Sequence, residues 1–211
     1  MALTSKDFTA DNLTCVRGDR VLFRHIGFTL KPGGLMYVLG DNGSGKSSLL
    51  RLLCGLMQPE LGSIYWQGEQ VKHVLEVFQA NLLYIGHLNG LKEDLSPIEN
   101  LQVNMRLAAD HAEKSDVLDA LEAIGVGRCA NLPVRVLSQG QKRRVALARL
   151  WLTERKLWIL DEPFAALDSA SIDVLVARIN HHLNNDGMAI ITTHQDVVIS
   201  AQSTQVLRLD L

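Results

Sequence analysis

The sequence predicts an α/β fold, with a helical lobe inserted into a core of buried strands. Three apolar runs of strand length lie at residues 35–39, 157–160 and 189–192, as expected for strands buried on both faces. A helical pattern at 172–183 separates the last two runs and completes a strand–helix–strand unit. Residues 97–152 are helical in pattern and lie between the early and the late strands.

The elements before the lobe can be read in order. Alternating apolar residues predict short strands at 13–17, 21–23 and 27–30. The buried run at 35–39 leads into a glycine-rich loop, and a helix with a leucine-rich face should follow it. Residues 63–66 predict another strand. The leucines on the predicted helix are Leu49, Leu50, Leu52, Leu53 and Leu56.

Two helices are predicted inside the lobe, and one strand at the end of the chain. The second helix should run over residues 140–152, and a final strand at 205–209 should lie at the edge of the sheet. The first helix is predicted by a shared apolar face formed by Val117, Leu118, Leu121 and Ile124.

Length and organisation indicate a single domain over residues 1–211. A chain of 211 residues fits one large domain, and no linker or internal repeat divides it. We expect a core at about 1–90 and 153–211, with the helical lobe at about 91–152.

The composition indicates a folded protein with no general affinity for nucleic acid. Hydrophobic residues make up 47% of the chain, and 21 Lys+Arg stand against 23 Asp+Glu. No apolar run approaches the roughly 18–20 residues that cross a bilayer, and the first eleven residues lack a signal peptide's apolar core. We therefore expect a cytoplasmic location.

The three cysteines, Cys15, Cys54 and Cys129, are widely spaced, which predicts reduced, partly buried thiols.

Residues 40–47 match the phosphate-loop pattern, between a buried strand and a helix. The glycines let successive N–H groups point at phosphate oxygens, and the helix N-terminus adds the positive end of its dipole. Lys46 should reach the β- and γ-phosphates, and the Ser47 hydroxyl should ligate Mg²⁺. The predicted ATP-binding residues of this loop are Gly40, Asp41, Asn42, Gly43, Ser44, Gly45, Lys46, Ser47 and Ser48.

Two carboxylates follow the apolar run at 157–160, at the strand end where open α/β sheets bind their ligands. We expect Asp161 to hold Mg²⁺, directly or through water. Glu162 should face the other way along the strand, where it suits orienting or deprotonating the attacking water. Such a pair also occurs at solvated strand ends, but beside a phosphate loop it predicts hydrolysis.

A second anion site is predicted just before the helix at 140–152. The phosphate site at Lys46 is already complete, so another γ-phosphate site makes sense if it serves a second copy of the chain. Two copies placed head-to-tail about a twofold axis would sandwich two ATP molecules. The residues of this signature segment are Leu137, Ser138, Gln139, Gly140 and Gln141.

The phosphate loop, the signature segment and the Asp-Glu strand occur in the order found in ABC ATPases, which the chain resembles. The resemblance implies a phosphate-loop ABC-type nucleotide-binding domain with an antiparallel β subdomain and an inserted helical lobe. It also implies that Asp168 belongs to a D-loop that communicates across the dimer. His194 resembles the switch histidine at the γ-phosphate, which would make it catalytic together with Glu162 and Lys46. As lone residues, Asp168 would be a helix N-cap and His194 a strand-end histidine.

Segments at 83–92, 99–101, 143–152 and 157–164 resemble, more narrowly, the ATPase subunit of the bacterial haem exporter of cytochrome c maturation (CcmA). This resemblance covers nearly the whole chain. It implies ATP hydrolysis that drives a membrane ABC complex and releases a haem-loaded chaperone. The implied partners are integral membrane ABC subunits and the haem chaperone complex, at the cytoplasmic face of the bacterial inner membrane.

Three positions depart from the family pattern. His87 stands where most ABC ATPases have a glutamine that touches Mg²⁺ and links ATP to the membrane subunit. Either His87 takes this sensing role, with a pH dependence set by a reference pKa of about 6.5, or it only shapes the loop. Arg17 stands where an aromatic residue stacks on adenine. Its guanidinium can stack on a base, with Val16 or a neighbouring aromatic as the alternative.

Gln139 replaces the middle glycine of the signature segment, and we expect this replacement to be tolerated.

Other interpretations of the same residues are weaker. Adjacent helical residues face different ways, so His181 and His182 should form a solvated helix end and not a haem site. A non-transport ABC ATPase that remodels another macromolecule usually carries a coiled-coil insertion, and no heptad run separates Lys46 from Ser138. A small-molecule kinase has no use for the signature segment.

Overall fold

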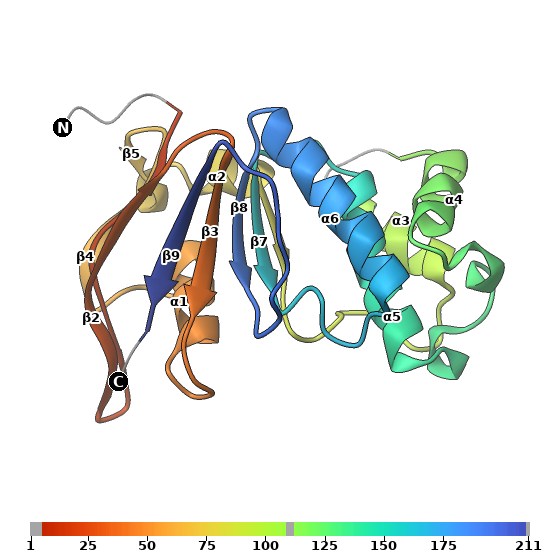
Figure 1. Ribbon diagram of the computed structural model, residues 1–211, viewed down its shortest axis with the longest axis horizontal. Helices are drawn as coiled ribbons and strands as arrows, with labels where there is room; N and C mark the ends of the chain where they lie inside the picture. The colour runs from red at the N-terminus through yellow and green to blue at the C-terminus, as the bar shows by residue number, and fades with distance from the viewer. Residues whose placement is uncertain (1–5, 109–111, 210–211) are drawn as a thin grey trace. The chain divides into compact units, whose positions relative to one another are not determined.

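The computed structural model describes residues 6–108 and 112–209, and its strands form two sheets (Figure 1). The first is a four-stranded antiparallel sheet in the order β2-β1-β4-β5. The antiparallel β subdomain implied by the resemblance is therefore present. Its strands are β1 (Phe8–Arg17), β2 (Arg20–Leu30), β4 (Leu61–Trp66) and β5 (Glu69–Gln70).

The second sheet has five parallel strands in the order β6-β7-β8-β3-β9. Its three central strands are the three apolar runs that predicted the fold, and the last strand of the chain lies at the edge, as expected. The strand β6 was not predicted. The strands are β3 (Gly34–Leu39), β6 (Leu82–Ile85), β7 (Leu157–Asp161), β8 (Met188–Thr192) and β9 (Ser203–Arg208).

The prediction of three short N-terminal strands was wrong. Two long strands stand in their place, because β2 continues through His25 in a left-handed conformation with φ of 55°. The His25 ring nitrogen Nδ1 lies 2.8 Å from Asn12 Oδ1 on β1, and the pairing shifts register on either side of this contact. A bulge of this kind adds local twist without ending a strand, and sequence alternation alone does not reveal it.

The helix α1 (Lys46–Leu53) packs into a core shared by both sheets, since it contacts β1 and β7. Its leucines Leu49, Leu50, Leu52 and Leu53 are fully buried. The predicted fifth member of this face, Leu56, lies beyond the helix and is 59% exposed. Gly55, with φ of 70°, ends the helix before it.

The helix α6 (Ser169–Asn184) ends in a packed contact where a solvated turn was predicted. The His182 ring stacks on the indole of Trp158 with centroids 3.7 Å apart and planes 2° from parallel. Its Nε2 lies 3.2 Å from the Met188 carbonyl oxygen at the start of β8. Only His181 is exposed. The prediction was wrong for His182 because its partner comes from β7, far away in sequence.

The chain divides into two compact units. One comprises the residues up to Gly86, Arg155–Glu162 and the residues from His182, and it holds both sheets; the other comprises His87–Glu154 and Pro163–His181. The predicted lobe at about 91–152 leaves out residues 163–181. The remaining helices are α2 (Leu75–Ala80), α3 (Pro97–Leu107), α4 (Lys114–Ala123) and α5 (Gln139–Leu147), with 3₁₀ turns at Val71–His73, Gly127–Cys129, Val134–Val136 and Ala148–Trp151.

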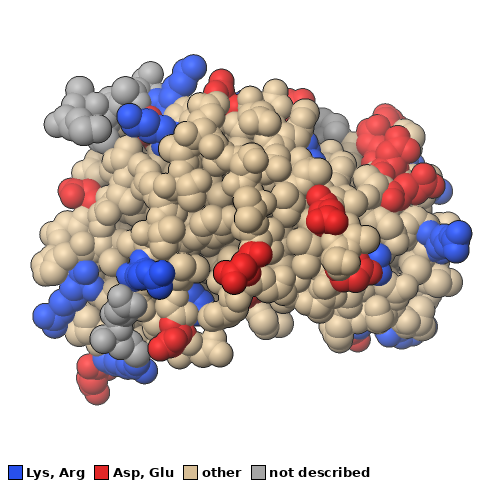
Figure 2. All heavy atoms as spheres, in the orientation of Figure 1, with Lys and Arg blue, Asp and Glu red and all other residues tan. Residues whose placement is uncertain are grey.

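Among the described residues, no helix has the length and hydropathy needed to span a membrane. On the face seen in Figure 2, Lys and Arg side chains lie scattered with Asp and Glu side chains among larger uncharged areas. The three thiols are free: Cys15 and Cys54 are buried, and Cys129 is half-buried. Burial raises the pKa of both buried thiols, so neither is poised for reaction.

Candidate functional site

The phosphate loop connects β3 to α1, and Gly45 is the N-cap of that helix. Gly45 has φ of 101°, and an added Cβ would lie 3.2 Å from Leu22 Cβ, so the position needs glycine. No described side chain caps α1, and its first turn holds no acidic residue. The N–H groups of this turn and the positive end of the helix dipole thus remain suited to an anion.

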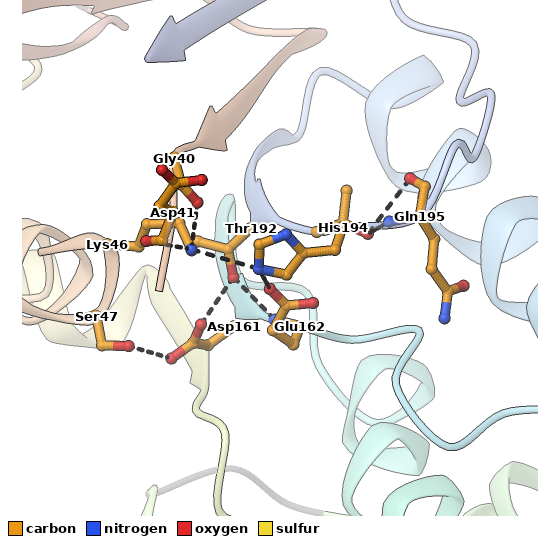
Figure 3. A network of polar contacts seen from close by, with 10 residues as sticks. Gly40, Asp41, Lys46, Ser47, Asp161, Glu162, Thr192, His194 and Gln195 are labelled. Atoms are coloured by element: carbon orange, nitrogen blue, oxygen red, sulfur yellow. Dashed lines mark hydrogen bonds and ion pairs between the residues drawn. The ribbon is translucent and has the colours of Figure 1, made fainter. Parts of the chain in front are cut away.

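The Lys46 amine lies at the mouth of this loop (Figure 3). Its Nζ donates to the carbonyl oxygens of Gly40 at 2.6 Å and Asp41 at 3.1 Å. The same nitrogen lies 3.4 Å from His194 Nε2, which follows β8. The phosphate loop and the strand end that carries His194 therefore meet at one ammonium group.

The Asp161 carboxylate ends β7 and is 4% exposed. Its Oδ2 accepts a hydrogen bond from Ser47 Oγ at 3.2 Å, in the first turn of α1. Its Oδ1 accepts one from Thr192 Oγ1 at 2.7 Å, across the neighbouring strand β8. Each carboxylate oxygen thus has a different partner, and the predicted Ser47–Asp161 pair is brought together.

Glu162 lies one residue beyond β7, with φ of 50°. The expected place of Glu162 on the strand was therefore wrong, because the strand has already ended in a left-handed turn. Its N–H donates to Thr192, at 2.9 Å to the side-chain oxygen and 3.2 Å to the carbonyl oxygen. Its Oε1 lies 3.4 Å from His194 Nε2. The His194 ring thus lies between Lys46 and Glu162, and the three predicted catalytic residues come together (Figure 3).

The signature segment begins the helix α5. Ser138 is its N-cap and forms a capping box with Gln141: Ser138 Oγ accepts from Gln141 N–H at 3.2 Å, and Gln141 Oε1 accepts from Ser138 N–H at 2.9 Å. Ser138 and Gln139 are exposed. A Cβ added to Gly140 would lie 2.8 Å from the Ala166 carbonyl oxygen, so glycine is needed here for backbone approach.

Asp168 has the local role expected of a lone residue at this position. It precedes α6, and its Oδ1 accepts from Ser171 N–H at 2.9 Å, as an N-cap does. Hydrogen bonds from Ser171 lower the pKa of this carboxyl, with a smaller contribution from the charge of Arg144. An exposed anion is therefore held at the start of the helix.

Arg17 and His87, two of the unusual positions, differ in their surroundings. Arg17 is exposed at the end of β1, opposite Arg20 on β2, and Val16 beside it is 37% exposed. Phe23 is buried, near the phosphate loop at Gly45. His87 is exposed and follows β6 by two residues. Within the part of the chain that the structure describes, neither Arg17 nor His87 forms a hydrogen bond or ion pair with another predicted site residue.

Sequence reasoning missed Thr192. In the sequence Thr192 is only the last residue of an apolar run, yet its hydroxyl touches both Asp161 and Glu162. The available signal was a polar residue at the end of a run that is otherwise apolar. Such a hydroxyl, when buried, normally has a hydrogen-bond partner.

Comparisons with known proteins agree with this geometry. The family model for the ABC transporter matches residues 23–165. The "Cytochrome c biogenesis ATP-binding export protein CcmA" of Dechloromonas aromatica is 52% identical over 95% of this chain and 98% of its own length. An ATP-binding protein of a putative ABC transporter from Pyrococcus furiosus superimposes with a TM-score of 0.82 at 24% identity, covering 96% of this chain and 98% of the other.

A dimeric post-hydrolysis state of the ATP-binding cassette MJ0796, bound to ADP and phosphate, also has this fold. It superimposes with a TM-score of 0.79 at 21% identity, covering 89% of this chain and 88% of the other. The matched region begins in β2 and ends beyond Glu162, so it contains both the phosphate loop and the carboxylate pair. The chain therefore belongs to the ABC transporter family, as an ATPase subunit of the CcmA type.

Proposed function

We propose that the chain hydrolyses ATP·Mg²⁺ in a head-to-tail homodimer and so drives a membrane complex of cytochrome c biogenesis. The observation that carries the proposal is the convergence of Lys46, Asp161, Glu162 and His194 at one edge of the parallel sheet. The pathway is supported by the relative named for cytochrome c biogenesis, which matches almost end to end.

The residues beside the phosphate loop fit a magnesium ion. Ser47 Oγ and Asp161 Oδ2 are hard oxygen donors 3.2 Å apart. Two oxygen ligands at about 2.1 Å and at right angles around Mg²⁺ lie about 3 Å from each other. Bound there, the ion would neutralise charge on the β- and γ-phosphate oxygens.

Charge and position support the proposed catalytic roles. Lys46 carries its ammonium at the loop mouth, where it suits the β- and γ-phosphates. Glu162 is a half-buried carboxylate beyond the strand end, which suits it to orient and deprotonate the attacking water. His194 lies 3.4 Å from each of these side chains and would contact the γ-phosphate between them.

The signature segment supports a dimer in which each ATP is shared. Ser138 and Gly140 begin a helix in the unit that does not contain the phosphate loop, and in our proposal they contact the γ-phosphate held by a second copy. The dimeric cassette with ADP and phosphate gives a precedent for the assembly in a protein of the same fold. Asp168 and its neighbours would then form the D-loop across the dimer.

The decisive experiment is gel filtration of Glu162→Gln with and without ATP. Blocking hydrolysis should trap the ATP-bound dimer, while the same variant without ATP should elute as a monomer. A Glu162→Gln, Ser138→Ala double variant is the matched control and should dimerise less. A small-molecule kinase would elute unchanged under all conditions, and that result would refute the sandwich.

The loop that carries His87 contacts α5, the helix that begins in the signature segment. This contact supports coupling to a partner. Within the helical unit, buried Arg143 donates through Nη1 to Asn89 Oδ1 at 3.3 Å, and Lys142 Nζ lies 3.0 Å from Glu93 Oε1. Leu88, beside His87, is 86% exposed. A membrane subunit that binds this exposed loop could therefore displace α5, the helix that Ser138 caps.

We propose accordingly that the partners are integral membrane ABC subunits and, through them, a haem chaperone that is released on hydrolysis. The chain would act at the cytoplasmic face of the bacterial inner membrane. If neither membrane subunits nor chaperone co-purify with it, the alternative of a non-transport ABC ATPase gains support.

His87 is proposed as the sensing residue of that loop, with its protonation making coupling depend on pH. ATPase rates of His87→Gln and His87→Ala in the assembled complex, measured from about pH 6 to 8, test this. The glutamine variant should lose the pH dependence and keep coupling, while the alanine variant should lose both. Rates that match the parent for both variants would leave His87 a loop-shaping role only.

A further inference from the structure

The Thr192 hydroxyl joins the two carboxylate residues of the site. It lies at the end of β8 and is fully buried, with an exposed fraction of 0%. Thr192 is in register with Asp161 on β7, and Oγ1 lies 2.7 Å from Asp161 Oδ1. The same oxygen lies 2.9 Å from the Glu162 backbone nitrogen. One side chain thus touches consecutive residues of the neighbouring strand end (Figure 3).

The chemistry of the three groups sets the direction of both hydrogen bonds. An ionised carboxylate only accepts, so the single hydroxyl hydrogen must go to Asp161. The Glu162 N–H can only donate, so a lone pair of Thr192 Oγ1 accepts its hydrogen bond. The result is a directed chain from the Glu162 N–H through Thr192 to Asp161, in which each bond polarises the next.

Threonine is informative at this position because packing does not require it. The rest of β8 is Met188, Ala189, Ile190 and Ile191, all buried, and valine would fill the last position with the same shape. Burying a hydroxyl costs free energy unless it is hydrogen-bonded, so its presence indicates that its bonds matter. Among the described residues, the Thr192 hydroxyl is hydrogen-bonded only to Asp161 and Glu162, the two carboxylate residues of the site.

Each bond has a distinct consequence. With Oδ1 of Asp161 held by Thr192, Oδ2 is left directed at Ser47, where the metal would lie. The Glu162 N–H donates to the hydroxyl at 2.9 Å and to the Thr192 carbonyl oxygen at 3.2 Å. The shorter of these bonds, to the hydroxyl, helps to keep Glu162 in the left-handed turn at φ of 50° that carries its side chain to His194. Left-handed backbone is unfavourable for a glutamate and persists only where its surroundings impose it.

We propose that Thr192 is a positioning residue for ATP hydrolysis: its hydroxyl orients Asp161 toward the metal position and holds Glu162 in the turn that presents its carboxylate. This inference rests on the roles proposed above for Asp161 and Glu162. Thr192 acts through those two residues, to which its hydroxyl is hydrogen-bonded.

The test compares Thr192→Val, which keeps the shape and removes the hydroxyl, with Thr192→Ser, which keeps the hydroxyl. Thr14→Val is the matched control, since Thr14 is also a buried threonine on a strand but lies in the antiparallel sheet. Three quantities are measured: kcat and KM for ATP hydrolysis, the ATP affinity by calorimetry with Mg²⁺ and with EDTA, and the melting temperature.

Thr192→Val should lower kcat by about tenfold or more, as loss of hydrogen bonds to a charged group predicts. It should also reduce the gain in ATP affinity that Mg²⁺ confers, and leave the affinity in EDTA unchanged because the phosphate loop is intact. Thr192→Ser should stay within about twofold of the parent on both measures. Thr14→Val should match the parent.

Parental kcat and parental Mg²⁺ dependence in Thr192→Val would overturn the proposal, as would equal losses in the serine and valine variants. If the valine variant fails to fold, Thr192→Ala replaces it: alanine and serine both remove the methyl group, so only the hydroxyl separates them. Glu162→Gln is measured alongside. If it keeps full activity, the role proposed for Glu162 is wrong; if it is inactive while Thr192→Val is not, only the positioning role fails.

Discussion

Two helix N-termini of this protein are built in opposite ways. The helix α1 begins at Gly45, which offers no side chain, and no described residue caps its first turn. The helix α5 begins at Ser138, which forms a complete capping box with Gln141. Both termini are anion-binding candidates by their backbone geometry, but only the first leaves its N–H groups without a side-chain partner from its own segment.

The difference indicates that the two helix starts act at different steps, α1 in nucleotide binding and α5 in dimerisation. A helix start without a side-chain cap is stabilised most when an anion arrives, so the phosphate loop is arranged for a ligand bound by the chain itself. At the capped start, the Ser138 and Gln141 N–H groups already have partners in the single protomer. In the proposed dimer, this box would give up part of its hydrogen bonding to a phosphate held by the second copy. We therefore expect nucleotide binding to depend on α1 and dimerisation to depend on α5.

The largest expected effect comes from Lys46→Ala. Removing a charged donor at the phosphates should weaken ATP binding by roughly 10- to 100-fold, because hydrogen bonds to charged groups contribute about 1.5–3 kcal/mol. Calorimetric titration of ATP measures it. The control is Lys31→Ala, an exposed lysine before the other end of β3, which should bind ATP normally. Equal affinity in the two variants would contradict the phosphate role of Lys46.

The next effect separates the cap from the trans site. Ser138→Ala should destabilise α5 by about 1 kcal/mol, leave ATP binding to the monomer unchanged, and reduce ATP-dependent dimerisation and hydrolysis about tenfold. The chain holds a matched control in α3, where Ser96 forms the same kind of capping box with Glu99. Ser96→Ala should lower stability equally and leave hydrolysis intact. Equal activity of both variants would reduce Ser138 to a helix cap.

A smaller effect is expected at Arg17. An exposed guanidinium over an aromatic ring contributes about 0.5–1 kcal/mol, so Arg17→Ala should weaken ATP binding about two- to fivefold. Arg20 lies opposite Arg17 across the hairpin and carries the same charge, so Arg20→Ala is the control. Equal weakening in both would indicate a general charge effect, and no change in Arg17→Ala would exclude stacking by this residue.

The smallest effect distinguishes the two capping boxes by pH. Hydrogen bonds from the Ser96 N–H and hydroxyl lower the pKa of Glu99, whereas the α5 box uses the neutral amide of Gln141. A lowered folded-state pKa means that Glu99 contributes stability above its unfolded pKa. This contribution is lost as the pH falls from the ordinary glutamate pKa of 4.5 through the lowered pKa of Glu99.

Amide exchange in the first turn of each helix, followed from neutral to acid pH, measures this. Protection at the start of α3 should fall in acid faster than protection at the start of α5. Glu99→Gln should remove the difference, and Gln141→Glu should transfer the pH dependence to α5. If the two turns lose protection in parallel in the parent, the boxes do not differ in this way.

Local pattern predicted the framework of the site well. The apolar run at 35–39, the glycines and the leucines of α1 each have a signature in a few consecutive residues, and so does the Asp161-Glu162 pair. β6 escaped prediction because only four residues form it, and much of its strand character comes from pairing with β7. β2 was predicted as two strands because the positive φ at His25 interrupts the alternation of apolar residues and is not itself visible in the sequence.

The failures closer to function have a common cause. His182 was expected in water but stacks on Trp158, and Glu162 was expected on the strand but lies in a turn held by Thr192. Each partner comes from another strand or helix. Periodicity and composition report which face of an element is buried, and they do not report which side chain of a distant element lies against it.

The sequence by itself thus determined the fold class, the phosphate loop, the signature segment and the identity of the carboxylates, because each depends on neighbouring residues. Only the tertiary structure decided which oxygen of Asp161 faces Ser47, which hydroxyl holds Glu162, and that His194 lies between Glu162 and Lys46. The physical reason is that these contacts join separate strands of a parallel sheet, whose register is set by the packing of the whole core.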